Sequence, residues 1–257
     1  MRLSVLLLCS VALLSALDVP VVQIPHAAVA PPLDAAATAG PAWQLAAVIP
    51  ALTQSIDRKR AVPDVLPATQ VRLMWTDAYL FIRFECADQS VYLPFDTHDA
   101  QLYRGDVVEV FLDPVGDARQ WFELQVAANN ATFDQNLVLT GEPRSDADGK
   151  LVGEVLARDW WVWPSYEMDG LKTAASKRAD GWTVELAIPA KSAGKRVGGK
   201  AWTSGQKLRA NLMRYEWGAP AADGNRPLIA MNWAPVLNGC PHTSPQAMGV
   251  FELVGSP

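Results

Sequence analysis

Polar and apolar residues alternate along much of the chain after residue 69, and a period of two predicts β-strands. Strands are expected at residues 70–75, 79–86, 107–112, 120–126, 181–188, 207–214 and 249–254. Connections rich in Gly, Pro and Asp separate them, and no stretch of a dozen residues shows a strong 3.6-residue period. Many short strands favour an all-β fold, an antiparallel β-sandwich of immunoglobulin-like or jelly-roll-like type with long loops.

The start of the chain has the pattern of a secretory signal. Arg2 supplies a positive charge, residues 3–14 are apolar, and two small residues follow. The apolar run is too short for a bilayer span, which needs roughly 20 residues. We expect a signal peptide at 1–16, a single domain over 17–257, and a secreted or periplasmic protein that has no membrane partner. Cys9 leaves a lipoprotein signal as the alternative.

Composition narrows the class of protein. Half of the residues are apolar, which is enough to bury the core of one large β domain. The chain has 22 Lys and Arg against 27 Asp and Glu, and it lacks the basic patch that a nucleic-acid partner requires. We expect a monomer that does not bind nucleic acid.

Two cysteines, Cys86 and Cys240, would remain after removal of the signal. An exported protein with two cysteines can join them in one disulfide. The alternative is a pair of buried thiols, which are common in β cores. The sequence leaves both open.

The segment 102–114 (LYRGDVVEVFLDP) combines an aromatic residue, acidic groups and an apolar strand. Tyr103 offers a flat apolar face to a pyranose ring and a hydroxyl for a hydrogen bond; the alternative is a loop aromatic packed on the edge of the sandwich. Asp106 and Glu109 lie three residues apart and therefore face opposite ways on a strand. One could bind a ligand while the other is buried against an arginine. Nothing marks the cleft that a pair of hydrolytic carboxylates would need.

The strand at 120–126 places Trp121, Glu123 and Gln125 on one face. An indole, an acid and an amide on one face can form a sugar-binding platform, and the alternative is the solvent face of an outer strand. Further along, Trp233 leads into the loop that carries His242. These residues are candidates for carbohydrate contacts.

Motifs for catalysis or metal binding are weak. His98 lies in the polar loop 96–99 (DTHD), which could hold a metal, but no second histidine follows at ligand spacing. The metal ligands therefore stay unassigned. The chain has no Gly-x-Ser-x-Gly elbow, phosphate loop or dinucleotide fingerprint. No catalytic residue is predicted, and we expect a protein that is not an enzyme.

Six blocks of sequence, in order, give the chain a resemblance to carbohydrate-binding module family 9 and to the wider DOMON-like sandwich group. The most specific block is 106–114 (DVVEVFLDP). The others are 39–43 (AGPAW), 71–81 (VRLMWTDAYLF) with 85–88 (ECAD), 122–126 (FELQV), 181–189 (GWTVELAIP) and 242–253 (HTSPQAMGVFEL).

The resemblance implies a sugar held between two aromatic rings, with polar side chains from a neighbouring strand binding its hydroxyls. The first ring falls on Tyr103, and the second falls on His242, where the family has tryptophan. The polar strand positions fall on Glu123 and Gln125. Some members bind structural calcium, so calcium is an expectation without assigned ligands, and no other cofactor is required.

The sequence therefore predicts an exported, non-catalytic carbohydrate-binding protein that stacks a mono- or oligosaccharide on loop aromatics. One alternative, taken from the DOMON-like group, is a haem-binding electron-transfer module with ligands among Met74, Met213, Met231, His98 and His242. The other is a glycan-active hydrolase, or an accessory subunit of one, in polysaccharide catabolism.

Overall fold

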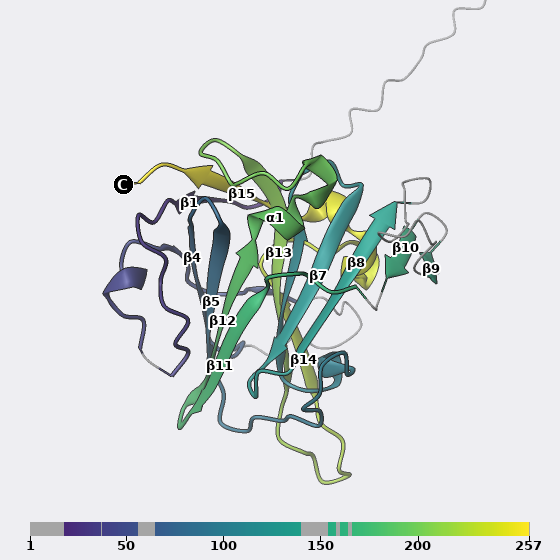
Figure 1. Ribbon diagram of the computed structural model, residues 1–257. Coiled ribbons are helices and arrows are strands. Elements are labelled where there is room, and N and C mark those ends of the chain that lie inside the picture. The colour runs from purple at the N-terminus through teal and green to yellow at the C-terminus, as the bar shows by residue number, and fades with distance from the viewer. Residues whose placement is uncertain are drawn as a thin grey trace, which may run out of the picture.

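Two β-sheets pack face to face in the computed structural model, which describes residues 18–36, 38–55, 65–139, 154–157, 160–163 and 166–256 (Figure 1). The predicted signal residues 1–16 lie outside the described residues. The strand order in the ten-stranded sheet is β1-β15-β13-β6-β7-β8-β10-β9, with β14 and β3 branching from β13, and in the five-stranded sheet it is β11-β12-β5-β4-β2. The predicted antiparallel β-sandwich is confirmed, and β1 with β15 forms a parallel pair.

The elements have the following bounds. The ten-stranded sheet contains β1 Val21–Pro25, β3 Gln54–Ser55, β6 Val107–Asp113, β7 Gln120–Ala127, β8 Thr132–Leu139, β9 Glu154–Ala157, β10 Trp160–Trp163, β13 Lys207–Trp217, β14 Leu228–Asn232 and β15 Gly249–Val254. The five-stranded sheet contains β2 Ala47–Ile49, β4 Thr69–Trp75, β5 Tyr79–Ala87, β11 Lys172–Arg178 and β12 Gly181–Pro189. The helix α1 spans Ala190–Ala193, and 3-10 turns span Pro41–Trp43, Leu102–Arg104, Lys195–Val197, Leu237–Gly239, Pro241–Thr243 and Pro245–Ala247.

All seven predicted strands are present, with ends that differ by at most three residues. The sequence did not predict β8, whose interior holds Asp134, Gln135 and Asn136, because such residues are depleted in strands. It also did not predict the polar edge strand β11 (KTAASKR). Tertiary pairing determines both strands: β7 pairs with β8 along seven residue pairs, and β12 pairs with β11 along seven.

The main core lies between the two sheets. Alternate residues of β6, Val108, Val110 and Leu112, face inward and pack in one cluster with residues of the five-stranded sheet such as Phe84 and Trp182. The other residues of β6 are buried too, because segments of chain cover the outer face of each sheet. This accounts for the dense apolar run at 107–112. None of the described helices is both long enough and apolar enough to cross a membrane.

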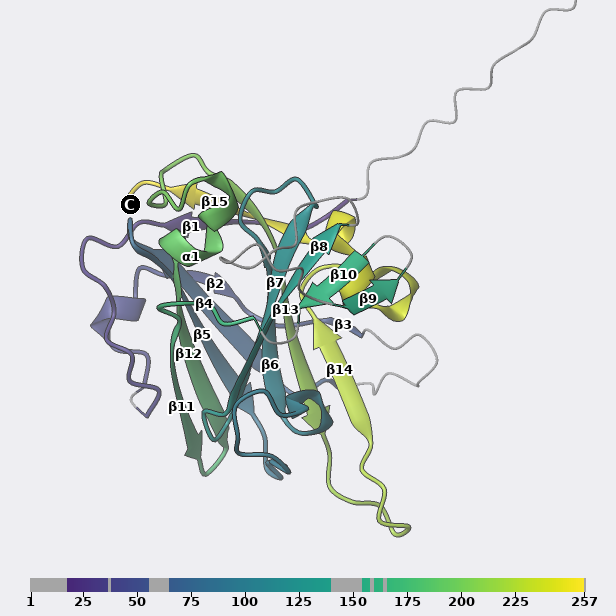
Figure 2. The same cartoon turned by 45° about the vertical axis from the view of Figure 1, so that its right-hand side comes forward.

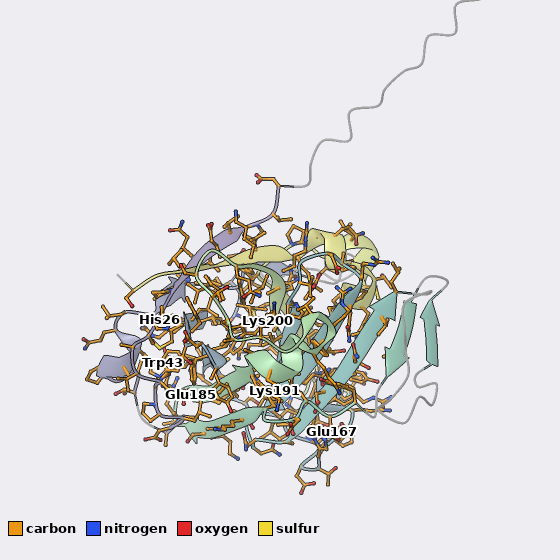
Figure 3. The ribbon with its side chains drawn as sticks, turned by 45° about the horizontal axis from the view of Figure 1, so that its top comes forward. His26, Trp43, Glu167, Glu185, Lys191 and Lys200 are labelled. Carbon is orange, nitrogen blue, oxygen red and sulfur yellow. The ribbon has the colours of Figure 1, made fainter. Side chains whose placement is uncertain are left out.

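The N-terminal segment covers the outer face of the five-stranded sheet. Trp43 is buried there, and the backbone N–H of Asp34 donates to Glu185 Oε2 at 2.6 Å. Glu185 also forms an ion pair with the buried Arg83. Figure 3 shows Trp43 and Glu185 on this side of the molecule. The charged pair is fixed between strand and segment, which anchors the start of the domain on the sheet.

The C-terminal segment 233–248 covers the outer face of the ten-stranded sheet. Its 3-10 turns, drawn in yellow in Figure 2, lie beside β8 and β10. Asn211 on β13 holds the segment through two hydrogen bonds to Ala234. Asn211 Nδ2 donates to the Ala234 carbonyl at 3.0 Å, and the Ala234 N–H donates to Asn211 Oδ1 at 2.9 Å. Val236 and Met248 pack from the segment onto Phe111 and neighbouring apolar side chains. This covered outer face is where the candidate site lies.

Candidate functional site

Polar side chains occupy two adjacent rows on the outer face of the ten-stranded sheet. Glu109 on β6 lies opposite Gln125 on β7, and Glu123 on β7 lies opposite Gln135 on β8. Because side chains alternate along a strand, all four project from the same face. We call Glu109, Glu123, Gln125 and Gln135, together with His242 of the covering segment, the Glu123 cluster.

Glu123 is the hub of this cluster. Its Oε1 accepts a hydrogen bond from Gln125 Nε2 at 2.6 Å. Its Oε2 accepts from Gln135 Nε2 and from His242 Nε2, the latter at 2.8 Å. The Glu123 side chain is 2 % exposed, and both of its oxygens are engaged. Glu123 therefore orients two amides and an imidazole rather than offering free acceptors.

The cluster contains a buried ion pair. Burial alone would lower the pKa of His242, but the charge of Glu123, with hydrogen bonds to Cys240 and Glu123, holds that pKa well above its usual value. Burial alone would raise the pKa of Glu123, and His242 with the two amides holds it below its usual value. Burial and, after it, the charge of Glu123 raise the pKa of Glu109 well above its usual range, and the charge of His242 offsets only part of this rise.

Two polar groups of the cluster have spare hydrogen-bonding capacity. Gln125 Oε1 is buried and has no hydrogen-bond partner within the part of the chain that the structure describes. The side chain of Glu109, a residue that is 2 % exposed, forms no hydrogen bond with any described residue. A buried polar group without a partner costs about 1–3 kcal/mol. The two side chains lie opposite each other on β6 and β7, so one ligand could reach both.

Two tyrosines lie at the end of the same face. Tyr103, in the 3-10 turn that precedes β6, is 41 % exposed. Its carbonyl accepts a hydrogen bond from Trp217 Nε1 at 3.1 Å, which fixes the turn on the end of β13. Tyr215 is on β13. Burial is the largest cause of its raised pKa, and Glu109, Glu123 and Tyr103 also raise it. Tyr215 thus links the exposed ring to the Glu123 cluster.

The other predicted contact residues are less accessible. Trp121 is fully buried in the apolar cluster beneath the covering segment, so its indole is not an exposed platform. Trp233 packs on Phe251, with ring centroids 5.3 Å apart. A Cβ at Gly249 would lie 2.5 Å from the Trp233 ring, so the closing glycine leaves room for that indole.

His242 does not occupy the position of a free stacking ring. Its Nε2 is bound to Glu123, and its ring meets Phe111 edge-on, with centroids 5.4 Å apart and an interplanar angle of 76°. Its side chain is 29 % exposed. The structure therefore gives His242 an electrostatic role within the cluster, and Tyr103 is the aromatic side chain of the site with a large exposed face.

The fold and sequence can now be compared with known proteins. A family profile described as carbohydrate family 9 binding domain-like matches residues 36–256. The chain belongs to this family. No curated protein sequence matches it.

Solved structures of family 9 share this fold. A carbohydrate-binding module family 9 from Caldicellulosiruptor kristjanssonii in complex with cellotriose superposes with a TM-score of 0.62 at 16% identity, covering 92% of this chain and 95% of that one. A carbohydrate-binding module family 9 from the same organism in complex with glucose superposes with a TM-score of 0.61 at 16% identity, covering 91% of this chain and 97% of that one. A proposed carbohydrate-binding protein from Bacteroides uniformis gives 0.65 at 15% identity, with 92% and 100% covered. These likenesses establish the fold.

Two residues of the candidate site, Gln135 and Tyr215, were not found from the sequence. Gln135 lies on β8, which was not predicted because the consecutive polar residues 134–136 hide the alternation of a strand. Tyr215 lies one residue beyond the predicted end of β13, in the outward series that runs through Met213. Extending the alternating pattern at 207–214 by one residue would have found Tyr215.

The predicted alternatives find little support in the packing. Met74, Met213 and Met231 are buried in three different apolar clusters, so no more than one of them could ligate a given haem together with a histidine. Asp106 is buried near Arg214, whereas Glu109 faces the outer side, which is the division that their spacing predicts.

A calcium ion needs several oxygen ligands. Within the described residues, one group of potential ligands is made of oxygen alone: Asp88, Asp106 and Glu216, whose carboxylates lie within 4.8 Å of one another. Both oxygens of Asp88 and of Asp106 already accept hydrogen bonds from nitrogen donors, and Glu216 pairs with Arg214. This group is satisfied by the protein itself and does not fit a calcium ion.

The disulfide considered from the sequence does not form, because Cys86 and Cys240 are both free. Cys86 lies between the sheets, and Cys240 lies in the segment that covers the outer face, so the ten-stranded sheet separates them. Burial raises the pKa of the Cys86 thiol to about 12. A hydrogen bond with His242 lowers the pKa of Cys240 to about 7.

We expect the two thiols to react at very different rates. Because the thiolate is the reactive form, Cys240 should be modified by a disulfide reagent in the native protein near pH 7.5, and Cys86 only after unfolding. Stopped-flow absorbance with and without denaturant measures this. Equal protection of both thiols, or a mass two units lower that signals a disulfide, would contradict the assignment.

Proposed function

We propose that this family 9 chain binds a carbohydrate at the Tyr103 end of the Glu123 cluster. Tyr103 would stack on one face of a sugar ring, while Glu109 and Gln125 would bind hydroxyls. The proposal includes export through the apolar segment 3–14, which N-terminal sequencing of the secreted protein would test. The observation that carries the binding site is the buried Gln125 Oε1, which has no hydrogen-bond partner among the described residues and lies opposite the buried Glu109.

The chemistry of the pair suits a sugar. Each pyranose hydroxyl donates one hydrogen bond and accepts others, and the Gln125 carbonyl oxygen needs a donor. Glu109, with its raised pKa, can offer an O–H as well as an acceptor. The solved relatives in complex with glucose and cellotriose make these two sugars the first probes.

The same geometry supports binding rather than hydrolysis. A glycosidase uses two carboxyl groups with different pKa values. The one with the raised pKa is the general acid, and the ionised one is the nucleophile or base. Glu123 would have to be the ionised partner, but both of its oxygens accept hydrogen bonds from Gln125, Gln135 and His242. Neither oxygen is free to attack a sugar or a water, so we propose no turnover.

Tyr103→Ala should weaken sugar binding by about 30-fold or more, because loss of a central aromatic contact typically costs about 2 kcal/mol. Isothermal titration with glucose and cellotriose measures the change. Folding should be preserved, since Tyr103 is exposed.

Tyr79→Ala is the matched control. Tyr79 lies on β5 of the other sheet, where the Lys172 ammonium sits 4.9 Å from its ring centroid. It should leave sugar affinity unchanged. Unchanged binding by Tyr103→Ala, or no binding by the unmodified protein to any mono- or oligosaccharide, would refute the site.

A further inference from the structure

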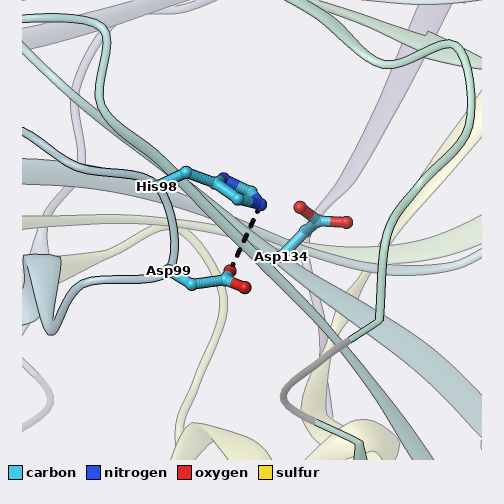
Figure 4. Close-up of side chains that lie close together, drawn as sticks. All are labelled: His98, Asp99 and Asp134. Atoms are coloured by element: carbon cyan, nitrogen blue, oxygen red, sulfur yellow. Dashed lines mark ion pairs between the residues drawn. The ribbon is translucent and has the colours of Figure 1, made fainter.

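A second group of potential ligands lies on the opposite side of the ten-stranded sheet from the Glu123 cluster. His98 and Asp99 belong to the loop between β5 and β6, and Asp134 belongs to β8 (Figure 4). One ligand atom from each lies within 4.8 Å of the others. Asp134 and Gln135 are neighbours on one strand and so point to opposite faces. The group is therefore distinct from the proposed sugar site.

The imidazole of His98 is held in the orientation of a metal ligand. Its Nδ1 lies 3.0 Å from the carbonyl oxygen of Thr132 and 2.9 Å from the Thr132 hydroxyl. A carbonyl oxygen can only accept, so Nδ1 carries the hydrogen. Metal-binding histidines commonly donate their second ring N–H to such a carbonyl, which fixes the tautomer and turns the other nitrogen to the metal.

The other ring nitrogen of His98, Nε2, faces carboxylates. Its Nε2 lies 2.9 Å from Glu167 Oε1 and 3.5 Å from Asp99 Oδ1. A lone pair on Nε2 would repel these oxygens, so a positive centre must lie among them, either a proton on Nε2 or a metal ion. In a tetrahedral site with bonds of about 2.0–2.1 Å, the ligand atoms are about 3.3–3.4 Å apart. The separations of 2.9 and 3.5 Å bracket that value.

Asp134 supplies an independent sign of a ligand. It is 2 % exposed, and its Oδ2 accepts a hydrogen bond from the Met168 N–H at 2.6 Å. Within the described residues its other oxygen, Oδ1, has no hydrogen-bond partner. A carboxylate whose side chain is this deeply buried is stable only with a cation or with further hydrogen-bond donors.

The charges of the group do not balance. Asp99, Asp134 and Glu167 act on one another with negative charge, and His98 acts on Asp99 and Asp134 with positive charge. Among the described residues, no lysine or arginine forms an ion pair with Asp99, Asp134 or Glu167. One protonated imidazole leaves a surplus of negative charge on the three carboxylates, and a divalent ion would neutralise it.

We propose that His98, Asp99 and Asp134 bind a divalent transition-metal ion of the Zn²⁺ type, with Glu167 within reach as a fourth ligand. One imidazole with carboxylates suits zinc and its neighbours, whereas calcium takes oxygen ligands. The ion would tie the loop that leads to Tyr103 onto β8. The backbone already begins this link, since the N–H of Asp99 donates to the Thr132 carbonyl at 3.0 Å.

Titration of ZnCl₂ into the chelator-treated full chain tests the proposal without any sugar. We expect one site with a Kd of about 1 µM or tighter. His98→Ala and Asp134→Asn should each weaken it by about 100-fold or more, which exceeds the usual effect of losing an outer partner. Co²⁺ in place of Zn²⁺ should give visible absorption that is lost in the same two variants.

His26→Ala is the matched control. His26 also pairs with a carboxylate, Asp77, at 3.2 Å, but it is in neither group of potential metal ligands found among the described residues. Figure 3 labels His26 well away from Glu167. His26→Ala should bind zinc like the unmodified protein, as should His242→Ala.

Three results would overturn the metal site. These are the absence of zinc binding below about 100 µM, binding that His98→Ala leaves intact, and binding that only His242→Ala removes. The last result would place the ion in the Glu123 cluster. If no zinc binds, the imidazole is simply protonated. Because zinc is titrated without sugar, either proposal can fail while the other stands.

Discussion

Glu123→Met should lower the free energy of unfolding by about 3–5 kcal/mol, the usual cost of removing one partner of a buried ion pair. The substitution leaves the partly buried His242 without its carboxylate partner and removes the acceptor of both Gln125 and Gln135. Urea unfolding followed by tryptophan fluorescence measures the change, with Met chosen because it matches glutamate closely in length.

The double variant Glu123→Met/His242→Leu separates the ion pair from packing. Removing the imidazole should recover part of the loss, with a coupling of about 0.5–3 kcal/mol. If the two substitutions lower the free energy of unfolding additively, the ion pair is contradicted. A loss below about 1 kcal/mol for Glu123→Met alone would also contradict it.

The cost of Glu123→Met should also depend on pH. The lowered pKa of Glu123 contributes stability above its ordinary value of 4.5 and loses it as the pH falls through the folded-state pKa. The raised pKa of His242 contributes stability below its ordinary value of 6.5 and loses it as the pH rises through the folded-state pKa. The substitution should therefore cost most between about pH 4.5 and 6.5 and less at pH 9.

Glu109→Met should have the opposite effect on stability. It replaces a buried carboxyl that has no described hydrogen-bond partner with an apolar chain of similar length, and should raise the free energy of unfolding by about 1–3 kcal/mol. The same change should weaken sugar binding by about 30-fold or more, because it removes a polar contact at a buried position. Urea unfolding and isothermal titration measure the two effects.

The paired substitutions control for each other. Both place methionine at neighbouring buried positions on one sheet face, so a difference in sign reports hydrogen bonding rather than volume. Destabilisation by Glu109→Met would show that Glu109 already has a partner in the protein. Stabilisation with unchanged sugar affinity would remove Glu109 from the binding site.

The sequence predicted the sandwich because strand periodicity and ordered blocks are local signals. The strand at 120–126 shows this: its alternation correctly placed Trp121, Glu123 and Gln125 on one face. The block at 106–114 correctly gave a buried strand. These signals depend only on neighbours along the chain.

The sequence did not predict that the segment 233–248 covers the outer face of the ten-stranded sheet. Whether Glu123 is a free acceptor depends on His242, which is 119 residues away and is placed by the fold of the covering segment. Burial of Trp121 and the separation of Cys86 from Cys240 have the same cause. Polar strand residues such as Gln135 were missed because their β-propensity is low. Cross-strand partners can stabilise such residues in a strand all the same.

A crystal structure of the protein with cellotriose tests the central claim most directly. We predict a sugar ring against the exposed face of Tyr103, with hydroxyls within hydrogen-bonding distance of Glu109 and of Gln125 Oε1, and with the bonds between Glu123 and His242 unchanged. A sugar bound elsewhere on the molecule, or one that reaches Tyr103 without contacting Glu109 or Gln125, would contradict the account.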